Sequence, residues 1–242
     1  MWLNNSKKFF LDLFFPKKCL GCGHPDTYLC RDCFTRLPAR QDRIQIIENN
    51  TCFFCGKISW KGKICIECAK ENSLERIISA AEYKNPLVRD LIKAFKYHFV
   101  QELAKPLSQI LIKVIENNWK LEIENWKLIL VPIPLHGSRM RYRGFNQAEL
   151  LAREVTDYFK LPLETDILKR KISTTPQAKI KDTEKRKVNL ENVFEVNPKL
   201  VEGKIVILID DVTTTGATLI EAAKVLKNSG AKEVWGLVVA KG

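Results

Sequence analysis

At residues 205–218 the sequence reads Ile205-Val206-Ile207-Leu208-Ile209-Asp210-Asp211-Val212-Thr213-Thr214-Thr215-Gly216-Ala217-Thr218. Five consecutive apolar residues are typical of a strand that is buried on both faces, as in a parallel sheet. Two carboxylates, several hydroxyls and a glycine follow at once, and helical spacing of apolar residues begins at Ala217. The stretch therefore predicts a strand, a ligand-binding turn and a helix in succession.

The composition of this turn predicts the chemistry of its ligand. Hydroxyls and backbone amides at a helix N-terminus form a site for phosphate, and Gly216 lets the backbone approach the anion closely. The carboxylates cannot bind the phosphate, but they can bind hydroxyl groups or a hydrated Mg²⁺. We therefore expect a ligand that carries both, such as a phosphorylated sugar. Neither common nucleotide-binding glycine loop is present in the sequence.

The region around this turn has the pattern of an α/β domain. Short apolar runs alternate with segments of helical spacing, as expected for a parallel sheet flanked by helices. We predict a domain at residues 76–242, preceded by a separate module at residues 1–75. The expected helices cover residues 87–95, 103–115, 148–159 and 217–227, and the expected strands cover 128–133, 205–209 and 234–240.

The N-terminal module contains all eight cysteines, in four C-x-x-C pairs: Cys19/Cys22, Cys30/Cys33, Cys52/Cys55 and Cys65/Cys68. Two thiolates at this spacing can face one tetrahedral ion, so the pattern predicts two structural Zn²⁺ sites with no open position for catalysis. We prefer sequential pairing, which leaves seven and nine residues between the pairs. A cross-braced pairing, with 29 and 31 residues between the pairs, and a disulfide framework stay open.

Charge and hydropathy indicate a soluble protein with an anionic partner. The chain of 242 residues has a formal charge of +12, and two four-thiolate zinc sites would lower it to +8. Either value favours phosphate or nucleic acid, although lysine-rich solvated faces would give the same excess. No apolar run is long enough to span a membrane, and no secretory signal is present, so we expect a cytoplasmic protein. Residues 6–15 predict a short amphipathic helix, with a membrane-surface or partner-docking helix as the alternative.

The residues also resemble a known family. The stretch from Val206 to Thr218 resembles the phosphoribosyl-pyrophosphate (PRPP) signature of type I phosphoribosyltransferases. The double cysteine module, residues 131–136, residues 143–148 and Thr175-Pro176-Gln177 resemble the ComF branch, which is associated with DNA uptake in natural competence. This resemblance covers almost the whole chain.

The resemblance implies roles for individual residues. Asp210 and Asp211 would hold the ribose hydroxyls at the catalytic centre, whereas Thr213 should not be assumed to touch the ligand. The 5′-phosphate would lie against Thr214, Thr215, Gly216, Ala217 and Thr218. The loop after strand 128–133 would bind pyrophosphate with Mg²⁺ through His136, Gly137, Ser138, Arg139, Arg141 and Arg143.

The resemblance also places a flexible hood over PRPP at residues 173–189, with Gln177, Lys179, Lys185 and Arg186 as its candidate contacts. A merely solvated basic loop is the alternative for this segment. Lys93 and Lys96 could add to the same basic surface, although lysines that extend from a helix into solvent are the more ordinary interpretation.

Two functions agree with these patterns. The first is a Mg²⁺-dependent phosphoribosyltransferase, a glycosyltransferase-class enzyme, whose acceptor the sequence does not identify. The second is a non-catalytic module that senses PRPP and binds single-stranded DNA or a helicase or other competence protein of the uptake machinery. Trp60, Phe53 and Phe54 are candidate stacking groups for the second function, or else covers for a zinc site.

Overall fold

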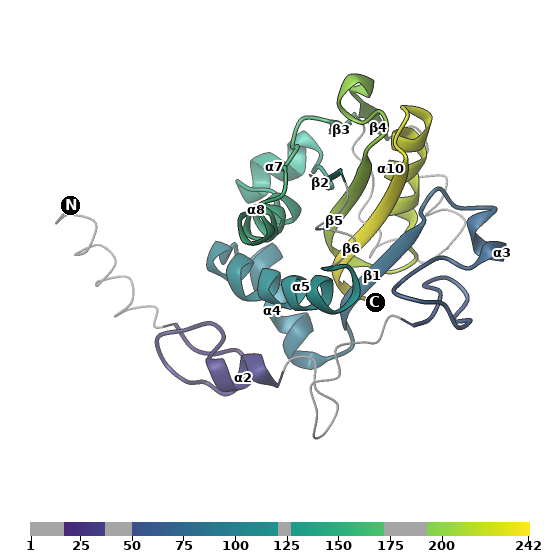
Figure 1. Cartoon of the computed structure of the whole chain (residues 1–242). Coiled ribbons are helices and arrows are strands. Elements are labelled where there is room, and N and C mark those ends of the chain that lie inside the picture. Colours follow the sequence, from purple (N-terminus) through teal and green to yellow (C-terminus); the bar gives the residue numbers. More distant parts are fainter. Residues whose placement is uncertain (1–16, 37–49, 121–126, 172–192) are drawn as a thin grey trace.

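A sheet of four parallel strands forms the centre of the structure (Figure 1). The computed structural model describes residues 17–36, 50–120, 127–171 and 193–242. The strands lie in the order β1 (Arg76–Glu82), β6 (Glu233–Lys241), β5 (Ile205–Thr213) and β2 (Leu128–Pro132). Every neighbouring pair in this sheet is parallel, which confirms the predicted α/β class.

Strand β5 is buried on both faces, as its apolar run predicts. Ile205, Ile207 and Ile209 belong to one hydrophobic core, whereas Val206 and Leu208 belong to a second core. Successive side chains of a strand point to opposite faces of the sheet, so each face needs its own cover.

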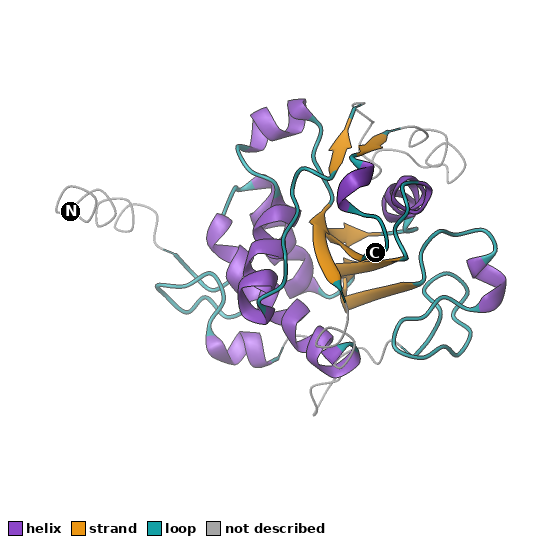
Figure 2. Ribbon diagram, turned by 45° about the horizontal axis from the view of Figure 1, so that its top comes forward, coloured by secondary structure: helices purple, strands orange, loops and turns teal. Residues whose placement is uncertain are grey.

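Helices supply this cover on both faces (Figure 2). One face packs against α4 (Pro86–Tyr97), η1 (Gln101–Leu103), α5 (Ala104–Asn118) and α8 (Gln147–Phe159). The other face packs against α10 (Ala217–Asn228) and the small antiparallel pair β3 (Leu168–Arg170) and β4 (Phe194–Val196), with η3 (Pro198–Leu200) close by. The helices expected from periodicity are confirmed to within a few residues.

Two predicted boundaries were wrong. The strand expected at 205–209 continues to Thr213, because β6 pairs with it through Lys241. The loop expected at residues 135–139 is partly helical, since α7 (Gly137–Arg143) begins within it. His136 Nδ1 accepts the N–H of Ser138 at the start of α7, and Gly144 ends the helix at φ 77°.

The cysteines form two clusters on opposite sides of the sheet domain (Figures 1 and 2). The first cluster is Cys19, Cys22, Cys30 and Cys33, and it includes α2 (Arg31–Thr35). The second cluster is Cys52, Cys55, Cys65 and Cys68, and it includes α3 (Ile66–Ala69). The sequential pairing is therefore confirmed, and the cross-braced and disulfide alternatives are wrong, since all eight cysteines are free.

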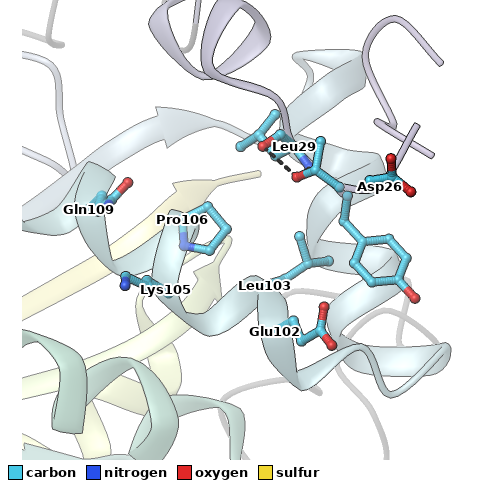
Figure 3. A pocket seen from close by; sticks show the side chains of 9 residues that line it. Asp26, Leu29, Glu102, Leu103, Lys105, Pro106 and Gln109 are labelled. Atoms are coloured by element: carbon cyan, nitrogen blue, oxygen red, sulfur yellow. Dashed lines mark hydrogen bonds between the residues drawn. The ribbon is translucent and has the colours of Figure 1, made fainter. Parts of the chain in front are cut away.

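The first cluster makes side-chain contacts with η1 and α5. Lys17 Nζ lies 2.7 Å from Glu102 Oε1, and Lys113 Nζ lies 4.6 Å from the centre of the Phe34 ring. A hollow of about 220 Å³ lies between the first cluster and α5, and Tyr28 and Pro106 are among the residues that line it (Figure 3). A second hollow of about 500 Å³ lies between Phe34 and Tyr158. The first cluster thus contacts the helices through Tyr28, Leu29 and Phe34, with two hollows beside these contacts.

The second cluster is continuous with the hydrophobic core. Cys52, Phe53 and Ile64 are buried in the same core as β5 and α10. The N–H of Ile77 in β1 donates to Gly62 O at 2.8 Å, and the N–H of Ile64 donates to Glu75 O at 2.9 Å. Backbone hydrogen bonds therefore attach this cluster to the edge strand of the sheet.

A pair of buried indoles marks the junction of α5, β6 and the second cluster. The ring centres of Trp119 and Trp235 lie 4.9 Å apart, and neither side chain is exposed. Trp119 Nε1 donates to Lys61 O at 3.1 Å, which joins the end of α5 to the second cluster.

Some sequence predictions concern parts of the chain outside the described residues. They are the amphipathic helix at 6–15 and the whole of the hood at 173–189, including Gln177, Lys179, Lys185 and Arg186. In the part of the chain that the structure describes, none of the helices has the length and apolar character needed to span a membrane.

Candidate functional site

The predicted ligand-binding residues lie at the edge of the sheet where β2 ends. Strand β5 extends beyond the end of β2 at this edge. Pro132 of β2 pairs with Ile209, and no β2 residue pairs with β5 beyond this point. Asp210 and Asp211 therefore lie next to the end of a shorter neighbour, at the carboxyl edge where open parallel sheets bind ligands. The turn at residues 214–216 and the start of α10 follow directly.

The two aspartates have different surroundings. Asp211 is 4% exposed, and its Oδ1 lies 2.8 Å from Lys96 Nζ of α4. Burial acts to lower the pKa of Lys96, but the charges of Asp211 and Asp210 outweigh it, and this pKa is raised. Lys96 thus belongs to the site rather than to a solvated surface, whereas Lys93 is exposed.

Asp210 has a raised pKa. Its Oδ1 accepts the N–H of Asp211 at 2.8 Å. Burial and the neighbouring charge of Asp211 raise the pKa of Asp210 from 3.8 to about 7, although the charge of Lys96 opposes them. A carboxyl group with this pKa changes its charge near neutral pH, where small changes of ligation decide its protonation state.

The turn after β5 has the shape of an anion site. Gly216 adopts φ 80°, in the left-handed region, and precedes the first residue of α10. The hydroxyls of Thr213 and Thr215 accept the N–H groups of Gly216 and Ala217 at 3.1 and 3.4 Å. Thr213 thus serves the turn itself, in agreement with the expectation that it need not touch the ligand.

Thr214 supplies an unpaired polar group in this turn. Its Oγ1 is buried and has no hydrogen-bond partner. A buried hydroxyl without a partner costs free energy, about 1–3 kcal/mol, so its presence at this position calls for a partner. A bound phosphate oxygen would provide an acceptor, which fits the predicted role of this turn.

Arginines approach the aspartates from α7 and β3. Burial lowers the pKa of Arg139, as does the charge of Arg143, and the charge of Asp210 acts on it in the opposite direction. Burial also lowers the pKa of Arg170 to about 10, together with the charge of Arg139. Arg139 and Arg170 therefore lie within electrostatic reach of each other and of Asp210, an arrangement that suits a multiply charged anion.

Arg170 is a residue that sequence reasoning missed. It lies in β3, next to Lys169 and Lys171, and this basic run precedes the segment chosen as the hood. These three consecutive basic residues were the sequence feature that could have indicated an anion site. Nothing in the sequence indicates that Arg170 of β3 lies within electrostatic reach of Arg139 of α7.

The other predicted pyrophosphate residues remain near Arg139 on α7. His136 Nδ1 lies 2.8 Å from Ser138 Oγ, so both side chains are used at the helix start. Gly137, Ser138 and Arg141 are exposed. Arg143 Nη1 donates to Gln147 Oε1 at 2.8 Å, and its guanidinium lies 5.7 Å from the centre of the Tyr97 ring.

Exposed aromatic residues lie beside these arginines. Tyr97, Phe99 and Tyr142 are 55%, 39% and 73% exposed, and the rings of Phe99 and Tyr142 lie 5.6 Å apart. We call these three residues the aromatic patch. By contrast, Phe53 is buried and Phe54 packs against the core, so they cover the second cluster instead of offering stacking surfaces.

The two cysteine clusters have the donor set of zinc sites. In each cluster the four sulfurs all lie within 4.8 Å of one another. Burial acts to raise the pKa of Cys19, but N–H groups of Cys30, Gly21 and Cys22 outweigh it and lower the value to about 6. In the second cluster, N–H groups of Cys65, Cys55 and Phe54 outweigh burial in the same way and lower the pKa of Cys52 to about 6. Amides directed at these two sulfurs favour their thiolate form, the form that binds zinc. Burial and the neighbouring cysteines raise the pKa of Cys33, and they raise that of Cys68 to about 12.

Comparison with known proteins agrees with this geometry. Residues 142–241 match the model of the phosphoribosyl transferase domain, which confirms the predicted type I phosphoribosyltransferase fold. The chain is 28% identical to the DNA utilization protein YhgH of Escherichia coli K12, over 90% of this chain and 86% of that protein. It is also 28% identical to competence protein ComFC of Bacillus subtilis, over 85% and 80% of the two chains.

A further relative covers both halves of the molecule. Competence protein F of Haemophilus influenzae is 31% identical to this chain over an alignment of 237 residues, which covers 94% of this chain and 99% of that protein. The match thus includes the double cysteine module together with the sheet domain and its carboxyl edge. On these grounds the chain belongs to the ComF family of competence proteins.

Proposed function

We propose that this protein binds PRPP with Mg²⁺ at the carboxyl edge of its sheet and transfers the phosphoribosyl group to an acceptor during DNA uptake. The observation that carries the proposal is the convergence of Asp210, the turn with the unpaired Thr214 hydroxyl, and the arginines of α7 and β3. Carboxylates, an anion turn and guanidinium groups match the hydroxyls, the 5′-phosphate and the pyrophosphate of one ligand.

The proposed roles follow from this match. Asp210 and Asp211 accept hydrogen bonds from the ribose hydroxyls, and residues 214–218 bind the 5′-phosphate. The pyrophosphate lies against Arg139, Arg141, Arg143 and Arg170, and the charge influence of Arg139 and Asp210 on Arg170 supports including it. Mg²⁺ bound with the pyrophosphate supplies further positive charge to the leaving group.

The transfer breaks the bond between the anomeric carbon and the pyrophosphate oxygen, which leaves with the electron pair. The acceptor forms a new bond to that carbon and loses a proton. Positive charge develops on the ribose and negative charge on the leaving group, so the carboxylates and the guanidiniums stabilise opposite ends of the transition state. The acceptor itself is not identified by the described residues.

Calorimetric titration of Mg²⁺ and PRPP into zinc-loaded protein tests the binding step. We expect micromolar binding by the wild type and a loss of at least tenfold in the double variant Asp210→Asn/Asp211→Asn. Asp157→Asn is the matched control, because Asp157 is exposed on α8 beside the second hollow. Absence of binding by the wild type would remove the proposal.

A screen for pyrophosphate release tests the transfer step. Bases, amines and oligonucleotides are offered as acceptors together with PRPP, and release is compared with that of Asp211→Asn. Release by the wild type alone identifies the acceptor class. If binding is seen but no acceptor gives release above the variant, the protein senses PRPP without transferring its ribosyl group.

The aromatic patch favours a second candidate function, the binding of single-stranded DNA. The exposed rings provide stacking surfaces, and the adjacent Arg141 and Arg143 provide cations. Stacking surfaces and cations are the usual means of binding single strands. In this function the protein is a cytoplasmic module of the uptake machinery, with a helicase or another competence protein as its partner. Reduced thiolate clusters fit that compartment.

Oligonucleotide affinity measured at several salt concentrations separates this function from the first. Phosphate contacts release counterions, so the logarithm of affinity must fall with the logarithm of salt concentration. We expect Tyr142→Ala to weaken binding about tenfold, as loss of one stacked base does. A flat salt dependence would contradict the second function and leave PRPP binding untouched.

A further inference from the structure

The second cysteine cluster lies directly behind the turn that is proposed to bind the 5′-phosphate. A Cβ atom placed on Gly216 would lie 3.1 Å from Cε1 of Phe54 and 3.5 Å from Cε1 of Phe53. The two rings of the cluster therefore lie directly beside Gly216, in the space that a side chain at this position would need. This contact joins two parts of the chain that are remote in sequence.

The metal-binding residues hold these two rings in place. Phe53 and Phe54 lie between Cys52 and Cys55, in a turn where the N–H of Gly56 donates to Cys52 O at 2.9 Å. The rings lie 5.3 Å apart with an angle of 83° between their planes. Because a metal bound by Cys52 and Cys55 would fix both ends of the segment, it would also fix the positions of the rings.

The end of β6 contacts both the second cluster and the start of the phosphate-binding turn. Lys241 Nζ donates to Phe53 O at 2.7 Å and lies 3.9 Å from the centre of the Phe53 ring. The N–H of the next residue, Gly242, donates to Thr213 O at 2.8 Å. Two consecutive residues, Lys241 and Gly242, thus donate hydrogen bonds to the second cluster and to Thr213 at the beginning of the turn.

The first cluster offers an internal comparison. Its ion pair and its cation–ring contact go to Glu102 of η1 and Lys113 of α5. Among the described residues, the side chains that pack around Gly216 come from the second cluster. Each cluster offers four cysteine sulfurs to a metal, but the two clusters pack against different parts of the structure.

We propose that the second cysteine cluster, when it holds its metal, positions the phosphate-binding turn by pressing Phe54 and Phe53 against Gly216. Glycine has the widest conformational freedom of any residue, so without this support the turn samples many conformations. Phosphate binding must then order it again, which weakens the affinity. Phe54 is a positioning residue in this scheme and does not touch the ligand. The effect on the ligand rests on the proposed function.

Binding of two fragments of PRPP tests the scheme. Ribose 5-phosphate probes the turn, and pyrophosphate with Mg²⁺ probes the arginines of α7 and β3. We expect Phe54→Ala to weaken ribose 5-phosphate roughly tenfold, the factor for ordering about one residue, and to leave pyrophosphate within about twofold. Phe54→Met restores most of the affinity, because its side chain reaches as far as the ring Cε1. Ile58→Ala, an exposed apolar truncation in the same cluster, changes neither affinity.

Amide hydrogen exchange at residues 213–220 tests the same coupling without any ligand. Phe54→Ala accelerates exchange there, whereas Ile58→Ala does not. Cys55→Ser and Cys22→Ser each remove one exposed thiolate, from the second and the first cluster respectively. Zinc content falls in both variants, but we expect only Cys55→Ser to accelerate exchange at 213–220.

The outcomes separate this inference from the proposed function. If the wild type binds neither fragment, the proposed function fails, and hydrogen exchange still decides whether the cluster positions the turn. If exchange at 213–220 is the same in all variants, the inference is overturned even when PRPP binds. Equal acceleration by Cys22→Ser, or equal weakening of both fragments by Phe54→Ala, would also overturn it, because general destabilisation would then explain the result.

Discussion

Lys96 and Asp211 form an ion pair at the base of the candidate site, and their side chains are only 18% and 6% exposed. Removing one partner of a buried pair leaves the other charge without compensation, at a cost of about 3–5 kcal/mol. We expect Lys96→Met to lower the free energy of unfolding in urea by about this amount. Lys93→Met, a turn earlier on the exposed side of α4, changes it by less than about 0.5 kcal/mol. Equal effects of the two variants would show that the pair does not matter for stability.

Asp210 gives the stability a pH dependence of known sign. Its pKa is raised to about 7 in the folded protein, from 3.8, so the folded state holds this proton more tightly than the unfolded state. The free energy of unfolding therefore falls as the pH rises from about 4 to about 7, and this contribution is flat above that range. We expect a fall of at most about 4 kcal/mol, at about 1.4 kcal/mol for each unit of pKa difference, that Asp210→Asn abolishes, measured by urea unfolding at several pH values. An unchanged slope in the variant would contradict the assignment.

At the scale of residues, sequence reasoning located the ligands that are adjacent in the chain. Asp210, Asp211 and the turn after them follow from one uninterrupted pattern. Lys96 was named only as one of two lysines that could join the basic surface, and Arg170 was missed, because helical or strand periodicity shows which face a residue occupies but not what lies opposite. Their roles depend on α4 and β3 meeting β5, which is a property of the tertiary structure.

At the scale of elements, α7 is a short helix that positions Arg139, and its first turn depends on His136. An N-cap side chain contributes about 1 kcal/mol, a large share for a helix of seven residues. We expect His136→Ala to lower the free energy of unfolding by about 1 kcal/mol and to weaken pyrophosphate binding. His136→Asn, which keeps a capping acceptor, restores the stability. Unfolding in urea and calorimetry of pyrophosphate check both effects, and full stability in His136→Ala would contradict the capping role.

The elements themselves were largely predictable, because strands and helices that build the two cores have strong apolar periodicity. The errors lie where periodicity is absent. The helix α7 has no buried residue, so its polar sequence resembles a loop. The extension of β5 to Thr213 depends on hydrogen bonds from β6 and not on apolar side chains. The boundary between the two domains at residues 75 and 76 stays a prediction.

At the scale of the whole molecule, the two cysteine clusters support different parts of the structure. We expect excess chelator to release two Zn²⁺ per chain and to lower the Tm by at least about 5 °C, since each kcal/mol shifts the Tm of a domain of this size by about 2–4 °C. The far-UV circular dichroism is largely retained, because both cores are built mainly from residues after 75. Metal analysis and thermal unfolding provide the measurement. Complete loss of secondary structure on chelation would contradict this view.

The sequence predicted that the cysteines form two four-thiolate sites, but it could not place them. Spacing within a C-x-x-C pair reflects local geometry, whereas the location of a cluster depends on partly buried apolar residues such as Phe34 and on buried ones such as Phe53. Both types look alike in the sequence. The structure assigns Phe34 to the helix α5 and Phe53 to the core behind α10.

The neighbouring indoles of Trp119 and Trp235, whose planes are tilted by 52°, allow this arrangement to be followed by fluorescence. An indole in dry apolar surroundings fluoresces at shorter wavelength than one in contact with water, and two rings 4.9 Å apart exchange excitation energy. Because Trp119 Nε1 is bound to Lys61 O, detachment of the second cluster admits water to this ring first. The part of the emission that comes from Trp119 and Trp235 therefore shifts to the red when that cluster leaves the sheet, without any added dye.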